Sequence, residues 1–295
     1  MEEFPVAALC ARLGLTGPVE RFPEGSLPVY AVGEDLVLKL YPPGDAAEAR
    51  TETLVLRALD GRLPVPTPAV VGEGEWRGWW WLLMSRLHGE SLASAWPRLS
   101  TPERAGLATS LGETLAALHA VDDPALTELE PRDWAGFVAA RRGVVAAEQR
   151  ELGLDERWLR QLPDFLDAVD LGEPEPVLLH TEFMREHVLL RHDGKRWHVS
   201  GLLDFEPAMR GAAEYDLVAA GVFLAGGDTR FLRSLLLGYG YSPAALDVCF
   251  ARRCLAYTLL HRYANLAGYL RRLPAPPEPT LDALARTWFL PAGRD

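Results

Sequence analysis

The chain has 295 residues, 48% of them hydrophobic, and a formal net charge of −11 at pH 7. This apolar content excludes a disordered or fibrous protein, and the length allows two lobes with a cleft between them. The acidic balance and the absence of a basic stripe argue against a nucleic-acid partner. Apolar runs stay far below the roughly 18 residues of a membrane span, and the acidic N-terminus shows no secretion-signal pattern. We therefore expect a soluble, cytoplasmic protein without a membrane partner.

The N-terminal third reads as a helix followed by short strands. Helical spacing covers residues 5–14, and two strands are expected to meet at a turn over residues 33–35. Lys39 lies inside the apolar run that follows, although only two of the 30 basic residues are lysines. Glu52 comes next, in a segment with helical spacing, and is a candidate partner for the lysine. Glu48, one helical turn earlier, is the alternative partner. A lysine in an apolar strand invites a chemical explanation.

A strand at residues 69–72 and a stronger one at 79–85 complete the expected sheet. The second strand leads into an extended stretch over residues 86–92.

The remainder of the chain is mainly helical. A Ser-x-x-Glu capping signature at residues 100–103 predicts a helix that runs to about residue 121. Further helices are expected over residues 131–148, 155–169, 213–225, 228–239 and 243–273, with a last short helix ending near residue 289. On one continuous helix over 243–273, Tyr257, His261 and Asn265 would share a face and could line a pocket.

The most informative stretch is residues 178–206, which reads LLHTEFMREHVLLRHDGKRWHVSGLLDFE. His180, Glu182 and His187 precede an apolar run, a turn follows at residues 193–194, and a second apolar run ends at Asp204. Two strands joined by that turn would form a hairpin and bring His187 and Asp204 to the same end. The sequence therefore predicts that imidazole and carboxylate groups converge there.

The order of these residues resembles the aminoglycoside phosphotransferase-like family, which is the antibiotic and choline kinase branch of the protein-kinase-like fold. The family pattern is His-Gly-Asp-x-x-x-x-Asn-x-Leu followed by Ile-Asp-Trp/Phe-Glu, and here Glu182 stands in place of Asp and His187 in place of Asn. The resemblance covers essentially the whole chain. It implies a bilobal α+β fold, with a small antiparallel-sheet N-lobe over residues 1–87 and a larger, mainly helical C-lobe over residues 88–295.

The resemblance also implies roles for individual residues. Those expected to hold the nucleotide, ATP or GTP, are Lys39, Glu52, Ser85 and Leu87. Asp204 and His187 are expected to bind Mg²⁺, with Mn²⁺ as the alternative because an imidazole suits Mn²⁺ better. Glu182 and His180 are the expected catalytic residues: Glu182 accepts or orients the proton of the acceptor hydroxyl, in a catalytic loop that begins at His180.

Two residues outside this loop are expected to support it. The segment around Asp216 is similar to the family's Gly-Asp-Pro-x-x-Asp-Leu-Ala, which implies that Asp216 braces the catalytic loop without touching substrate. Residues 115–119 are similar to the family's Leu-x-x-Leu-His. His119 is therefore expected to be a structural residue that closes its helix.

The preferred function is a small-molecule kinase that transfers the γ-phosphate of a nucleoside triphosphate to a hydroxyl of an antibiotic or related metabolite. Because Glu182 and His187 both depart from the pattern at the reaction centre, the main alternative is a degenerate kinase-like protein that binds nucleotide or ligand without phosphoryl transfer. A third interpretation is a metal-dependent enzyme with His180, Glu182 and His187 as ligands, but it leaves Lys39 without a role. The acceptor, the choice between ATP and GTP, and the oligomeric state stay open.

Overall fold

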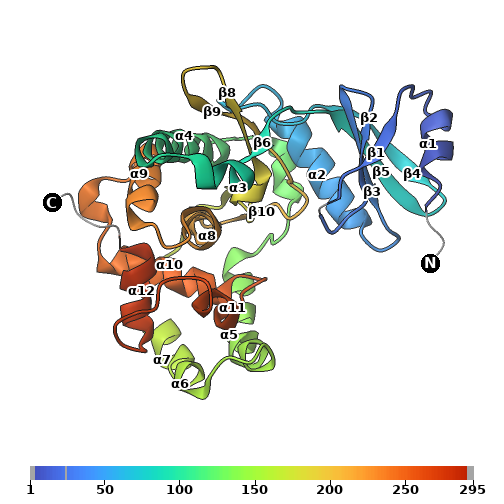
Figure 1. Cartoon of the computed structure of the whole chain (residues 1–295). Coiled ribbons are helices and arrows are strands. Elements are labelled where there is room, and N and C mark those ends of the chain that lie inside the picture. The colour runs from blue at the N-terminus through green and yellow to red at the C-terminus, as the bar shows by residue number, and fades with distance from the viewer. Residues whose placement is uncertain (1–3, 24, 291–295) are drawn as a thin grey trace.

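The structure, a computed structural model, describes residues 4–23 and 25–290. Figure 1 shows a β-rich N-terminal part beside a larger, mainly helical part, with α2 between them. The N-terminal part holds a five-stranded antiparallel sheet in the order β1-β2-β3-β5-β4. Its elements are α1 (Val6–Arg12), β1 (Val19–Arg21), β2 (Val29–Val32), β3 (Leu36–Tyr41), α2 (Ala46–Leu59), β4 (Val70–Trp76) and β5 (Trp79–Ser85). The expected α+β fold is confirmed.

Strand β3 lies in the centre of this sheet and has a different neighbour on each face. Leu38 and Leu40 pack into the small core beneath α1, whereas Tyr41 belongs to the main core that includes α2. Because side chains alternate along a strand, Lys39 lies on the same face as Tyr41, towards α2. The buried stripe of α2 is apolar except for Glu52 and Thr53. A lysine and a glutamate are therefore buried against each other between sheet and helix.

The rest of the described chain is mainly helical. Its helices are α3 (Leu92–Ala95), η1 (Trp96–Arg98), α4 (Thr101–His119), η2 (Pro124–Glu128), α5 (Trp134–Glu151), α6 (Glu156–Leu159), α7 (Leu162–Asp167), η3 (Arg185–His187), α8 (Ala213–Ala219), the π-helix η4 (Ala220–Ala225), α9 (Thr229–Tyr239), η5 (Pro243–Ala245), α10 (Val248–Leu260), α11 (Leu266–Leu270) and α12 (Leu281–Phe289). The capping box predicted at residues 100–103 is present at α4. The helix expected over 155–169 is instead split into α6 and α7, because Pro163 lies in the first turn of α7, where proline starts a helix.

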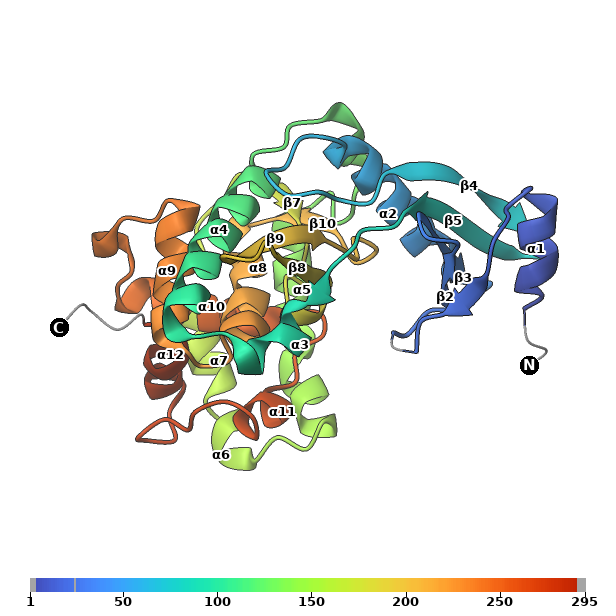
Figure 2. The same ribbon diagram turned by 45° about the horizontal axis from the view of Figure 1, so that its top comes forward.

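Two small sheets lie in the helical part at the side that faces the N-terminal sheet (Figure 2). One pairs β7 (Val177–Leu179) with β10 (Met209–Gly211), and the other has the order β6 (Glu90–Ser91), β8 (Val188–His192), β9 (Trp197–Leu202). Strands β8 and β9 form the predicted hairpin, whose turn is closed by Asp193 Oδ1 accepting from the backbone N–H groups of Lys195 and Arg196. The catalytic-loop segment therefore runs between β7 and β8.

The continuous helix expected over residues 243–273 is wrong, because α10 and α11 are separate helices. The backbone of His261 leaves the helical region, with φ −59° and ψ 139°. Asn265 then caps α11 by accepting a hydrogen bond from Gly268 N. Tyr257, His261 and Asn265 consequently do not share one helix face.

Across residues 4–23 and 25–290, no helix combines the length and apolar character that a membrane crossing requires.

Candidate active site

Lys39 is the centre of a buried ion-pair cluster. Its Nζ lies 2.8 Å from Glu52 Oε2 and 2.6 Å from Asp204 Oδ1, and it also contacts Glu206. Burial by itself would lower the pKa of Lys39, but the carboxylates of Glu52 and Asp204 outweigh it and raise the pKa well above its usual value. The lysine is therefore firmly protonated, and it links β3 to α2 and to the segment after β9.

Glu52, and not Glu48, is the helical partner of this lysine. Glu48 is exposed, whereas Glu52 is 2% exposed. Its carboxylate accepts hydrogen bonds from the Tyr41 hydroxyl and, at 3.2 Å, from the backbone N–H of Phe205. One carboxylate thus fixes α2 against both β3 and the residue that follows Asp204.

Asp204 has contacts on two sides. Its Oδ1 faces Lys39, while its Oδ2 lies 3.2 Å from Nε2 of His187. Burial would raise the pKa of Asp204, but the neighbouring Lys39 and His187 lower it. The backbone of Asp204 has a φ of 71°, a strained conformation for a residue with a side chain. The hairpin therefore brings a strained, ionised aspartate to Lys39, and the predicted convergence with His187 is present.

The ring of His187 is oriented by its own loop. Nδ1 lies 2.9 Å from the backbone oxygen of Glu182, and because a carbonyl only accepts, Nδ1 carries a proton. In the neutral ring Nε2 then offers a lone pair towards Asp204. Two groups of ligand atoms, each within 4.8 Å of one another, share Asp204: one contains Glu182 and His187, and the other contains Glu52 and Glu206. A cation between Nε2 and Asp204 would satisfy both atoms.

The carboxylate of Glu182 has no hydrogen-bond donor among the described residues, and the residue is half-buried. Burial raises its pKa, and the neighbouring His187 opposes that rise. Thr181, which stands where the family pattern has glycine, holds a left-handed backbone with a φ of 66°. The loop therefore presents Glu182 with an uncommitted carboxylate.

Asp216 holds this loop from beneath. Its carboxylate, fully buried, accepts from the backbone N–H groups of His180 at 2.7 Å and Thr181 at 2.5 Å. A third contact, 3.0 Å long, comes from Nε2 of His119, whose Nδ1 lies 2.8 Å from the Tyr239 hydroxyl. The structure thus places Asp216 and His119 as buried supports of the loop, as expected.

His180 is also a buried supporting residue. It is completely buried, and its Nε2 lies 3.0 Å from the backbone oxygen of Leu203, so the ring ties the loop to the end of the hairpin. Burial lowers the pKa of His180 to about 4. Its ring is not among the candidate metal ligands of the described residues. The alternative with His180, Glu182 and His187 as three ligands of one metal is therefore wrong.

The predicted base-binding segment follows β5. Ser85 exchanges two hydrogen bonds with Ala69: its Oγ accepts from Ala69 N at 2.8 Å, and its own N–H donates to Ala69 O at 2.9 Å. Arg86 N donates to Asp35 O at 2.7 Å. Leu87, in contrast, has both its N–H and its C=O without a partner within the described ranges. Of the two predicted residues, Leu87 is the one with open main-chain groups.

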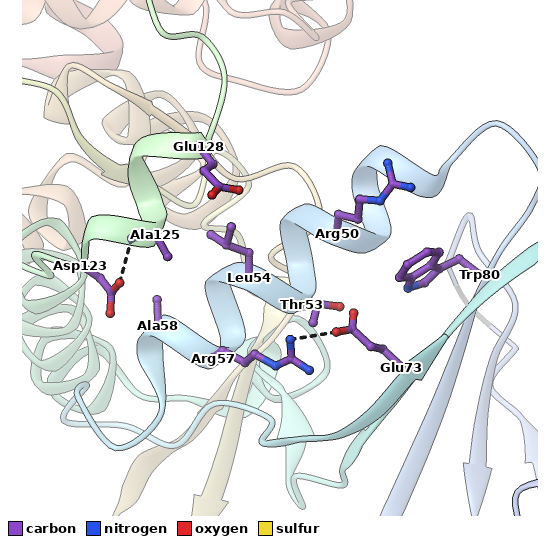
Figure 3. Close-up of a pocket in the computed structure, with 10 residues that line it drawn as sticks. All are labelled: Arg50, Thr53, Leu54, Arg57, Ala58, Glu73, Trp80, Asp123, Ala125 and Glu128. Carbon is purple, nitrogen blue, oxygen red and sulfur yellow. Dashed lines mark hydrogen bonds and ion pairs between the residues drawn. The ribbon is translucent and has the colours of Figure 1, made fainter. Parts of the chain in front are cut away.

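A separate pocket of about 490 Å³ lies beside α2, where the helix meets the sheet and η2 (Figure 3). It is lined by residues of α2 together with Glu73, Trp80 and the segment from Asp123 to Glu128. Arg57 and Glu73 form an ion pair across it at 2.8 Å. Lys39, Glu52 and Asp204 do not line it, so the pocket does not belong to the site around Lys39.

Sequence reasoning missed two participants in the cleft. Tyr41 follows Lys39 by two positions, so strand alternation could have placed it beside the lysine. Glu206 is the last residue of the Asp-Phe-Glu run, and its pKa is raised to about 7 because burial outweighs the opposing Lys39. Both were visible as residue types but were not assigned a role.

The chain has a bilobal fold in which a strand lysine pairs with a helical glutamate, and a His-x-Glu loop faces an aspartate after a hairpin. This combination defines a protein-kinase-like phosphotransferase. The sequence model of the "Phosphotransferase enzyme family" matches residues 18–252. The chain belongs to this family. The earlier resemblance is therefore confirmed at the level of family and fold.

Solved structures of antibiotic phosphotransferases share this fold. The GDP complex of aminoglycoside 2'-phosphotransferase-IIIa is 19% identical, with 86% of this chain and 87% of that chain covered and a TM-score of 0.72. A ternary complex of streptomycin, ATP and APH(2")-IIa is 15% identical, with coverages of 98% and 100% and a TM-score of 0.66. Macrolide 2'-phosphotransferase MphH from Brachybacterium faecium is 23% identical, with coverages of 98% and 99% and a TM-score of 0.65.

Proposed function

We propose that the chain transfers the γ-phosphate of ATP or GTP to a hydroxyl group of a small molecule, an antibiotic or a related metabolite. The observation that carries this proposal is the arrangement around Asp204. A protonated Lys39 lies on one side of Asp204, and the uncommitted carboxylate of Glu182 lies on the other, with ligand atoms within 4.8 Å. A phosphate-binding cation and an acceptor-side base thus flank one metal-binding carboxylate, as phosphoryl transfer requires.

The nucleotide would lie between the sheet and the helical part. Lys39, fixed by Glu52, is placed to neutralise phosphate oxygens, which would replace its carboxylate partners on one side. The open N–H and C=O of Leu87 support a base at this end of β5, because they can form the paired hydrogen bonds that a purine edge offers. Ser85 would shape the same edge through its hydrogen bonds with Ala69.

A divalent metal fits the residues present. Asp204 supplies an ionised oxygen, and Nε2 of His187 points at it because Nδ1 is anchored on the loop backbone. Carboxylate oxygens suit Mg²⁺, whereas the imidazole nitrogen shifts the preference towards Mn²⁺. When bound, the metal would neutralise charge on the phosphate oxygens.

In the proposed reaction the acceptor hydroxyl oxygen forms a bond to the γ-phosphorus while the bond from that phosphorus to the bridging oxygen breaks. Glu182 takes the hydroxyl proton, and Lys39 stabilises the negative charge on the departing diphosphate. His180 and Asp216 hold the loop backbone and act by positioning. Most of the rate acceleration would come from position and charge, because a loose transition state needs little covalent assistance.

The proposal is tested by measuring ADP or GDP release over a panel of hydroxylated antibiotics and metabolites, in Mg²⁺ and in Mn²⁺. We expect at least one acceptor to accelerate release, with a phosphorylated product of matching amount. Nucleotide binding without any phosphorylated product would instead favour the degenerate binding protein. No nucleotide binding at all would reject both functions.

A further inference from the structure

The segment between α10 and α11, residues 261–265, is held rigidly by α5. Arg141 of α5 donates from Nε to Leu260 O at 3.1 Å. Gln149, completely buried, donates to Ala264 O at 2.8 Å and accepts from Leu266 N at 2.8 Å. Side chains of α5 thus hold the segment between α10 and α11 at both of its ends. These hydrogen bonds fix the direction in which the side chains of residues 262 and 263 project.

This segment places Arg262 next to the catalytic loop. One guanidinium nitrogen of Arg262 donates to the backbone oxygen of Pro207, and the same oxygen accepts from Thr181 Oγ1 at 3.0 Å. Thr181 immediately precedes Glu182. The backbone N–H of Arg262 donates to the Tyr215 hydroxyl at 2.9 Å, which fixes it further. The backbone oxygen of Pro207 therefore links the guanidinium to the loop that carries Glu182, the proposed base.

Arg262 is a cation without a matching anion. No carboxylate of residues 4–23 or 25–290 lies within ion-pairing distance of it, and its Nε is buried without a hydrogen-bond acceptor there. By contrast, Arg141 is neutralised by Glu148 at 2.5 Å. The guanidinium lies 4.9 Å from the ring centre of Tyr263, whose side chain is among the most exposed large apolar groups at 57%. An open aromatic face and an unpaired guanidinium thus adjoin each other.

An acceptor that binds at the catalytic loop would lie near the guanidinium of Arg262, which has no ion-pair partner among the described residues. A polycationic acceptor would bring ammonium groups beside this unpaired guanidinium and would be repelled. A carboxylate or phosphate would instead match the planar fork of N–H donors.

We infer that the acceptor is a hydroxyl compound that carries an oxyanion, a carboxylate or a phosphate, near the reacting hydroxyl, and that Arg262 is the residue that selects it. This inference rests on the proposed function. Tyr263 supplies an apolar face for the carbon skeleton beside the oxyanion. Polyamines such as aminoglycosides are then poor acceptors.

The test compares kcat and KM of the wild type with those of Arg262→Gln, Arg262→Lys and Arg150→Gln. The acceptors are hydroxylated carboxylates, sugar phosphates, neutral polyols and kanamycin, all at saturating nucleotide and metal. Arg150 is exposed at the end of α5, so its substitution removes one charge without touching the cleft. Comparing the carboxylate and phosphate acceptors shows which oxyanion is used.

We expect the best acceptor to carry an oxyanion. Arg262→Gln should raise its KM by about tenfold to a hundredfold with kcat changed far less, because a charge-assisted contact is lost. Arg262→Lys should retain part of the affinity, and Arg150→Gln should match the wild type. Three results would each overturn the inference: kanamycin or neutral polyols phosphorylated in preference to oxyanion compounds, no phosphorylation of any oxyanion compound, or an unchanged KM in Arg262→Gln. Failure of the wild type to bind nucleotide would instead overturn the proposed function, and a thermal-shift assay distinguishes the two.

Discussion

The two sides of Asp204 are held by different means. On the proposed nucleotide side, Lys39 is buried among carboxylates and is fixed by ion pairs to Glu52 and Asp204 of 2.8 and 2.6 Å. On the proposed acceptor side, His187 is fixed through the backbone oxygen of Glu182, at 2.9 Å, and the Glu182 carboxylate itself has no donor within the described residues. The first side is held by ion pairs between side chains, and we call it the charge-locked side. The second side is held by a hydrogen bond to the loop backbone.

This difference explains where the chain departs from its family pattern. Replacing a residue of the charge-locked side would leave a buried ion without its partner, which is strongly destabilising. On the acceptor side, the loop is held by Asp216 through backbone N–H groups, so the side chains at positions 182 and 187 can differ without loss of the loop. Glu182 and His187 lie on that side, as does Thr181, which stands in place of the family's glycine.

The largest expected effect belongs to Asp204, which both sides share. Asp204→Asn should lower kcat by about a thousandfold or more, because it removes the metal-binding charge and one partner of Lys39 together. Steady-state assays of the variant measure this, with Asp167→Asn, an exposed aspartate with its side chain 84% exposed, as the control. A loss of less than tenfold would contradict the central place of Asp204.

Glu182→Gln breaks the acceptor side alone. The change is nearly isosteric and removes the base, so kcat should fall by about a hundredfold while nucleotide affinity stays the same. Parallel measurements of turnover and nucleotide Kd separate the two sides. Glu186→Gln, an exposed neighbour in the same loop, should behave as the wild type. Turnover of the wild-type rate in Glu182→Gln would show that this carboxylate has no catalytic role.

His187→Asn should have the smallest effect, and it sharpens the comparison by probing the metal. Replacing the imidazole nitrogen with an amide oxygen should shift the ratio of activity in Mn²⁺ to activity in Mg²⁺ towards Mg²⁺ by about tenfold. Metal titrations of activity measure the ratio, with the exposed His198→Asn as the control. An unchanged ratio would place His187 outside the metal shell and leave it a structural residue.

Part of the site could be predicted from the sequence. The turn between two apolar runs indicates that His187 meets Asp204, whereas the pairing of Lys39 with Glu52 follows from the resemblance to the family. The fold class and the support from Asp216 also follow from that resemblance, since an ordered set of motifs carries them.

The sequence did not predict what depends on contacts between distant segments. Helical spacing predicts one helix over residues 243–273, yet the chain leaves the helix at His261. There Arg141 donates to the backbone oxygens of Leu260 and His261, and Gln149 donates to that of Ala264 and accepts from the N–H of Leu266. The position of Arg262 follows from that break. Complete burial of His180 likewise depends on Leu203 across the hairpin.

The central claim is that Lys39 and its carboxylates form a nucleotide site, and a thermal-shift titration tests it most directly. ATP or GTP with Mg²⁺ or Mn²⁺ should stabilise the wild type by about 2.7 kcal/mol when free nucleotide is a hundredfold above its Kd. Lys39→Ala should lose most of this shift relative to its own melting temperature, whereas Lys195→Ala, the other lysine, exposed in the hairpin turn, should keep it. No stabilisation of the wild type by either nucleotide in either metal, or an equal shift in Lys39→Ala, would contradict the claim.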